Sequence, residues 1–223
     1  MKRNNQLYSR KSSGFTIVEL MIATAVFSTI LIAITVGVIH FSALYYKGVY
    51  TSETQNTARD ISDEVANAVK FGAGDVVGIP ISDDQGGIPQ KGDVITFCAG
   101  GYVFVTTLGQ QYDSTAATTG LYMQPKGSNG CTADGNASQR KQLLAKNMRI
   151  AAIQLYQNSG QTNLYTFKIT IAYAPPDDGD DDATSVLTTT TDPGFSGSVH
   201  CKPGSGSQYC AVSSLVTTIE KRI

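Results

Sequence analysis

A long apolar run dominates the N-terminal part of the chain. From Leu20 to Ile39 no residue carries a formal charge, and leucine, isoleucine, valine, phenylalanine and alanine predominate. An α-helix needs about 20 apolar residues to cross a bilayer, so this run predicts a membrane-spanning helix. A secretory signal peptide differs from it, because its apolar core has only about 7–15 residues and its cleavage site follows that core.

The helical pattern continues beyond the apolar run, but on one face only. No proline occurs between residues 42 and 70, and apolar residues recur there at three- and four-residue spacing: Ala58, Ile61, Val65, Ala68 and Val69. This predicts an amphipathic helix whose apolar stripe packs on a folded domain and ends at the glycine-rich segment 71–74. A single helix from Phe15 to Phe71 would be about 85 Å long. The alternative is two helices with a break near Gly37 or Gly48.

After Gly74 the pattern changes to short apolar runs separated by glycine, serine, threonine and aspartate, which predicts β-strands. The strand-like segments are 93–97, 102–107, 149–157, 164–174, 185–190 and 212–220. In the fourth segment Tyr165, Phe167, Ile169, Ile171 and Tyr173 alternate onto one face. The predicted fold class is therefore α+β: one long N-terminal transmembrane and stalk helix packed against a C-terminal antiparallel β-sheet domain of about 150 residues.

The junction before the apolar run combines several charged residues. Four basic residues, Lys2, Arg3, Arg10 and Lys11, precede Gly14 and Phe15, and Glu19 is the last charged residue before the run. The basic residues predict a cytoplasmic N-terminus. A carboxylate carried to the bilayer centre costs roughly 2.5–3.5 kcal/mol, so Glu19 requires a partner there. An ordinary single-span anchor accounts for neither Glu19 nor the Gly14–Phe15 junction.

These residues resemble the N-terminus of the type IV pilin superfamily, which comprises pilins, minor pilins and the pseudopilins of type II secretion. The family pattern is a basic leader ending in glycine, then phenylalanine, a glutamate four residues later, and an apolar helix. The resemblance implies the pilin fold, cleavage between Gly14 and Phe15 by a membrane prepilin peptidase, and N-methylation of the Phe15 amine. It also implies assembly into a helical filament, where Glu19 pairs with the amine of a neighbouring subunit.

The expected organisation follows from the pattern and the resemblance together. Residues 1–14 are the prepilin leader, 15–41 the transmembrane and filament-core half of the helix, 42–72 its amphipathic half, and 73–223 an exported β-rich globular domain. We expect a minor pilin, with a type II secretion pseudopilin as the alternative and a membrane-tethered exported domain as a further one. Its expected partners are other pilin subunits, the prepilin peptidase and the pilus assembly platform in the membrane. The expected location is the cytoplasmic membrane, followed by an extracellular filament.

The four cysteines, Cys98, Cys131, Cys201 and Cys210, all follow the apolar run. An even number in an exported domain predicts two disulfides. Cys201–Cys210, which closes a short loop rich in proline, glycine and serine, and Cys98–Cys131 are favoured, and the other two connectivities remain open. A bridged C-terminal loop resembles the closed variable region of many pilins. A zinc site at His200, Cys201 and Cys210 is the alternative, although it lacks a convincing fourth ligand and the usual ligand spacing.

An acidic run at residues 177–182 is a candidate calcium site. The carboxylates of Asp177, Asp178, Asp180 and Asp182 are ligands that calcium prefers, and some pseudopilins and minor pilins bind calcium on such a loop. The run does not match the spaced pattern of an EF-hand, and a solvated connection between strands is the alternative. Apart from this possible calcium ion, no cofactor is expected.

Charge and motifs argue against two other classes of function. Arg140, Lys141, Lys146 and Arg149 form a modest basic cluster, but the formal net charge is −1 and no stacking aromatic residues are interleaved with it. We therefore expect a charge-balanced surface and no nucleic-acid partner. The chain contains no nucleophile elbow, phosphate loop or zinc-helix motif, so we expect no enzymatic activity.

Overall fold

The computed structural model describes residues 14–73, 75–79, 92–112, 119–127, 130–132, 139–174, 187–192, 195–203 and 206–222. The chain divides into two compact units, Met1–Ala43 and Leu44–Ile223. Helix α1 spans Ile17–Phe71, and it continues through Gly37 and Gly48 without the break that the two-helix alternative requires. The predicted boundaries at residues 14, 41 and 72 stay predictions.

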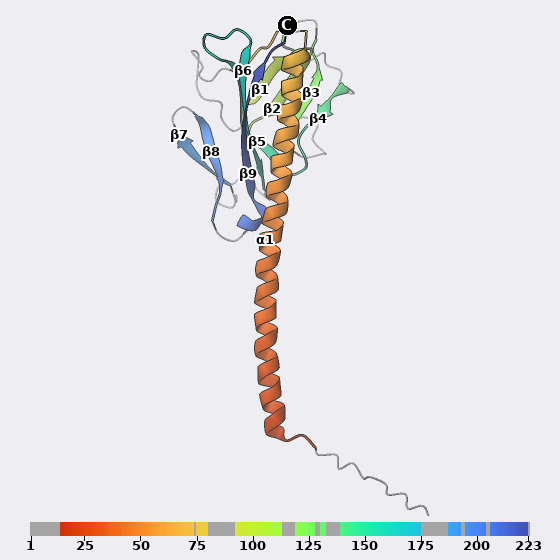
Figure 1. Ribbon diagram of the computed structural model, residues 1–223, viewed down its shortest axis with the longest axis vertical. Helices are drawn as coiled ribbons and strands as arrows, with labels where there is room; N and C mark the ends of the chain where they lie inside the picture. Colours follow the sequence, from red (N-terminus) through yellow and green to blue (C-terminus); the bar gives the residue numbers. More distant parts are fainter. Residues whose placement is uncertain are drawn as a thin grey trace, which may run out of the picture. The chain divides into compact units, whose positions relative to one another are not determined.

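The second half of α1 presents a buried stripe to the sheets. Its buried residues are Thr54, Ala58, Ile61, Ser62, Val65, Ala66, Ala68 and Val69. All five residues of the predicted apolar stripe are among them, which confirms the amphipathic pattern. Figure 1 shows this part of α1 beside the strands of the C-terminal region. Ser62 adds a polar contact, since its Oγ lies 2.7 Å from the Oγ1 of Thr217.

The helix ends where two glycines meet. The N–H of Gly72 donates to the carbonyl of Ala68 at 3.1 Å, which closes the last turn. A Cβ added to Gly72 would lie 2.2 Å from the Cα of Gly100, in the turn between the first two strands. Gly100 itself has φ of +59°. The close approach therefore requires glycine at both position 72 and position 100. Gly100 is also favoured because its φ lies in the left-handed region.

Within the described part of the chain, the strands form three antiparallel sheets (Figure 1), in agreement with the predicted antiparallel β-sheet domain. The four-stranded sheet has the order β1-β2-β3-β4, comprising Val94–Ala99, Tyr102–Thr107, Leu121–Pro125 and Lys141–Gln142. The three-stranded sheet has the order β5-β6-β9, comprising Met148–Gln157, Leu164–Tyr173 and Ala211–Glu220. A separate hairpin pairs β7, Leu187–Asp192, with β8, Phe195–Cys201, and a 3₁₀-helix η2 spans Ser207–Tyr209.

The main hydrophobic core lies between α1 and the inner faces of the first two sheets. Phe97 and Phe104 stack with ring centroids 4.8 Å apart, and both are fully buried. On β6, Phe167, Ile169 and Ile171 are buried, as their alternation predicts. The α+β fold class predicted from the sequence is confirmed.

A smaller core lies on the other face of the β5-β6-β9 sheet. It contains Val199 of β8 with Ala172, Ala174 and Cys210. Because Ala172 alternates with the inward-facing Ile171, its side chain points away from the main core. The β7–β8 hairpin therefore packs on the outer face of this sheet.

Two disulfides complete the fold. Cys98 pairs with Cys131 and Cys201 with Cys210, the connectivity that the sequence favours. The second bridge joins the end of β8 to the residue before β9. Since both sulfurs of Cys201 and Cys210 are in a bond, the alternative zinc site at these residues is wrong.

Candidate functional site

The predicted cleavage site lies just before the first helical residue. Gly14 and Phe15 precede Ile17, where α1 begins, and the Phe15 side chain is 88% exposed. Among the described residues other than its chain neighbours, no heavy atom lies within 4 Å of the place where a Cβ would stand on Gly14. The bond between Gly14 and Phe15 therefore lies outside helix α1.

Glu19 is held by the residue that caps the helix. Its Oε2 accepts hydrogen bonds from the backbone N–H and the Oγ1 of Thr16, both at 3.0 Å. The Thr16 Oγ1 in turn accepts a hydrogen bond from the N–H of Glu19 at 3.2 Å. This reciprocal arrangement is a capping box, which satisfies two of the backbone donors that the first turn of a helix leaves without partners.

The capping box gives Glu19 a role within its own subunit that the sequence analysis missed. The signal was readable, because Thr16-Ile17-Val18-Glu19 is a threonine followed three residues later by glutamate, directly before an apolar run. The box uses only Oε2. Within the described residues no hydrogen bond or ion pair engages Oε1.

The helix that follows is built for an apolar surrounding. Helix α1 contains a segment long and apolar enough to cross a membrane, and none of that segment is buried within the chain. Its hydroxyl groups are satisfied internally: those of Thr24, Ser28, Thr29 and Thr35 donate to carbonyl oxygens three or four residues earlier. These side chains therefore bring no unsatisfied donor into a bilayer or a helix bundle.

Comparison with protein families decides the nature of this N-terminus. A family model described as the prokaryotic N-terminal methylation motif matches residues 9–35. The chain carries a type IV prepilin-type signal. The signal implies processing by a prepilin peptidase and assembly with other pilin subunits, and together with the apolar helix it fits anchoring in a membrane. No curated protein and no solved structure matches the chain.

The basic cluster is engaged within the domain. The Lys141 Nζ lies 2.9 Å from the Oε1 of Glu64 on α1, and the Arg140 guanidinium stands 4.9 Å over the Tyr122 ring. The Arg140 Nε also donates to the Oε1 of Gln124. Arg149 is buried, with 9% of its surface exposed. Contacts within the domain therefore engage Lys141 and Arg140, and Arg149 is buried.

The predicted calcium site cannot be placed in the same way. Asp177, Asp178, Asp180 and Asp182 lie outside the described residues, as do the basic residues of the leader. Among the described residues, no group of three or more histidine, cysteine, aspartate or glutamate side chains could hold a metal ion.

Proposed function

We propose that this chain is a minor pilin, a non-enzymatic structural subunit of a type IV pilus or pilus-like filament. After cleavage at Gly14 and methylation of Phe15, the apolar half of α1 leaves the bilayer for a bundle of subunit helices. The C-terminal domain stays outside the cytoplasm throughout and then faces outward on an extracellular filament. No cofactor is needed for this role, and calcium binding at residues 177–182 would be an addition to it.

The observation that carries the proposal is the prepilin-type signal at the junction before an exposed apolar helix. A bilayer and a helix bundle both cover the side chains that α1 exposes, so a subunit can pass from one to the other without exposing them to water. The Oε1 of Glu19 pairs with the N-terminal amine of a neighbour. An ion pair in apolar surroundings gives specificity more than bulk stability, so Glu19 would set the register between subunits.

The minor role is supported by the outer part of the chain. Residues 73–223 form a region that is long for a major subunit, and serine, threonine and glycine are frequent in it. Two disulfides hold this region, which suits an exposed position at a tip or an accessory site.

Fractionation of sheared surface filaments tests the proposal. The chain should be present in the filaments as a small fraction of the subunits, and it should disappear from them when the prepilin peptidase is deleted. A filament composed mostly of this chain would refute the minor role. Recovery only with a type II secretion apparatus would support the pseudopilin alternative instead, and absence from every filament would leave a tethered exported domain.

A further inference from the structure

Among the strands that the structure describes, β9 is an edge strand with one side unpaired. It pairs with β6 only, at the end of the order β5-β6-β9. None of its residues from Ala211 to Glu220 makes a backbone hydrogen bond to any described residue outside that pairing. An unpaired strand edge is a row of donors and acceptors that an extended polypeptide can bind.

The register shows which residues face the open side. The N–H of Lys221 donates to the carbonyl of Asn163, the residue directly opposite it in the register. Backbone groups alternate along an antiparallel pair, so odd-numbered residues of β9 bond to β6 and even-numbered residues face outward. Arg222 agrees with this parity, because its N–H points away from β6 and donates to the carbonyl of Lys70 at 3.3 Å. Helix α1 thus closes the edge at that end.

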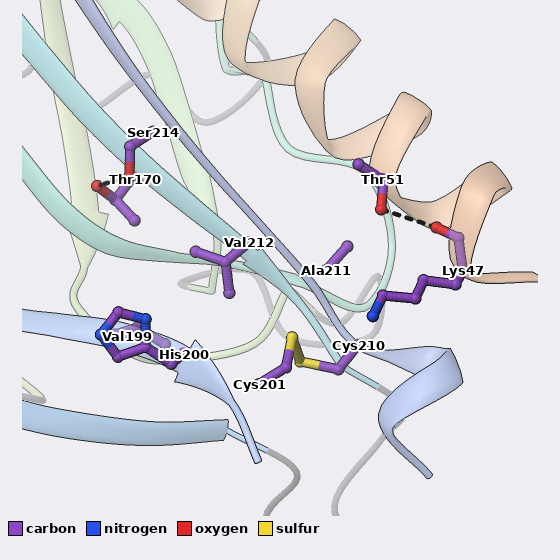
Figure 2. A pocket seen from close by; sticks show the side chains of 10 residues that line it. All are labelled: Lys47, Thr51, Thr170, Val199, His200, Cys201, Cys210, Ala211, Val212 and Ser214. Carbon is purple, nitrogen blue, oxygen red and sulfur yellow. Dashed lines mark hydrogen bonds between the residues drawn. A yellow bond between two sulfur atoms is a disulfide. The ribbon is translucent and has the colours of Figure 1, made fainter. Parts of the chain in front are cut away.

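The other end of the edge opens into a pocket of about 400 Å³ (Figure 2). Val212 and Ser214 of β9 line it together with Lys47 and Thr51 of α1, and His200 of β8 lies on its far side. The Cys201–Cys210 disulfide contributes to its wall. A strand laid along β9 here would therefore lie between α1 and the β7–β8 hairpin.

Lys47 gives the pocket its charge preference. Its side chain extends from α1 toward the disulfide in Figure 2, and no described carboxylate lies within ion-pair distance of it. The Thr51 hydroxyl is already used, since it donates to the Lys47 carbonyl at 2.7 Å, and the hydroxyls of Thr170 and Ser214 bond to each other at 2.9 Å. The positive charge of the Lys47 ammonium group therefore favours a ligand that carries a carboxylate.

We propose that the open edge of β9 binds an extended segment of a partner protein as an added strand, with a carboxylate of that segment on Lys47. The segment hydrogen-bonds to the backbone of Val212 and Ser214, and its alternate side chains enter the pocket. This inference does not rest on the proposed filament role, because it concerns only the C-terminal unit.

The test uses the full-length protein in detergent micelles and two labelled peptides of about eight residues. One alternates threonine and valine around a central aspartate, and the other carries lysine in place of the aspartate. The aspartate peptide should bind, as measured by fluorescence anisotropy, and the lysine peptide should bind more weakly. Lys47→Gln should weaken binding of the aspartate peptide about two- to fivefold, the range of a partly exposed ion pair.

Ser214→Pro is the decisive variant. Proline removes a backbone N–H that faces the open edge without removing a bond to β6, and it should weaken binding at least about tenfold. Ser214→Ala keeps that N–H and should bind as the unmodified protein does. In the unmodified protein, the bound peptide should slow hydrogen exchange at the amides of Val212 and Ser214 but not at those of Ser213 and Leu215, which already bond to β6.

Three results would each overturn the inference. These are no binding of the aspartate peptide at millimolar concentration, equal binding of the lysine peptide, and protection from exchange that does not follow the even-numbered residues. The exchange pattern needs no substitution, so it decides the matter even if Ser214→Pro fails to fold.

Discussion

Tyr50 of α1 and Tyr173 of β6 stack with their ring centroids 4.2 Å apart and their planes at 15°. Two more tyrosines extend this contact: Tyr209 of η2 lies 5.7 Å from Tyr46, and Tyr46 lies 6.3 Å from Tyr50. The cluster joins α1, β6 and the segment closed by the Cys201–Cys210 disulfide. Aromatic pairs of this kind contribute about 0.5–1.5 kcal/mol beyond the area they bury.

The contact makes stability sensitive to alkaline pH. A hydrogen bond with the Tyr173 side chain, followed by loss of hydration, raises the pKa of Tyr50 from its ordinary value of 10.0 to about 12. The folded state therefore holds the phenol proton more tightly than the unfolded state does. This contribution is complete below pH 10, and it is lost as the pH rises from about 10 to about 12.

Denaturant unfolding of the C-terminal unit of the full-length protein, followed at several pH values, measures this loss. Tyr50→Phe is the matched variant, because it keeps the ring and removes the titrating group. The difference in unfolding free energy between the two proteins should be constant up to pH 10 and then shrink. A difference that stays constant to pH 12 would show that Tyr50 does not couple folding to pH.

The turn at Gly100 should tolerate no side chain. Gly100→Ala places a Cβ 2.6 Å from both the Gly72 Cα and the Ala68 carbonyl oxygen, at a φ of +59°. Such strain costs at least about 1–3 kcal/mol of unfolding free energy. Gly101→Ala is the control, since no described atom outside its chain neighbours would lie within 4 Å of its Cβ and its φ is not in the left-handed region. Equal stability of the two variants would contradict the close helix–turn contact.

The two disulfides should stabilise the folded chain unequally. The sequence separation is 33 residues for Cys98–Cys131 and 9 for Cys201–Cys210. The loop-closure argument gives about 3.7 and about 2.6 kcal/mol, respectively. Replacing each pair by serines, in separate variants, should therefore lower the unfolding free energy more for the first pair. A larger loss for the second pair would contradict the loop-closure argument.

Two variants can distinguish the role of Glu19 as a helix cap from its proposed role in pairing subunits. Glu19→Gln keeps a side-chain acceptor at this position and removes the charge, whereas Thr16→Ala breaks the box and keeps the charge. If the carboxylate pairs subunits, Glu19→Gln should abolish incorporation into sheared filaments while leaving the start of the helix intact. Thr16→Ala should cost the helix about 1 kcal/mol and allow incorporation. The reverse result would make Glu19 a helix cap only.

The regular elements of this fold could be predicted because their signals are local. The stripe at Ala58, Ile61 and Val65 and the alternation at Phe167, Ile169 and Ile171 each match one period, and both faces are buried. Strand β4, which was not predicted from the sequence, lacks such a signal. Strand β4 has two residues, Lys141 and Gln142, and exists only by pairing with β3. The division into three sheets depends on long-range pairing, which no local pattern specifies.

The site residues also fall into those that the sequence predicts and those that only the fold brings together. The Gly14–Phe15 junction and Glu19 could be predicted because they belong to a motif of consecutive residues. Thr16, the capping partner of Glu19, lies in the same motif and could have been predicted too. The open edge of β9 and its pocket could not be predicted. Lys47 and Ser214 are 167 positions apart in the chain and line one pocket only because β9 runs past α1.

Intact mass and N-terminal analysis of the protein recovered from sheared filaments would show whether it is processed and assembled as a pilin. We expect a chain that begins at N-methylated Phe15 and whose mass is lowered by the four hydrogens that two disulfides remove. A chain that begins at Met1 and occurs only in the membrane fraction would contradict this expectation.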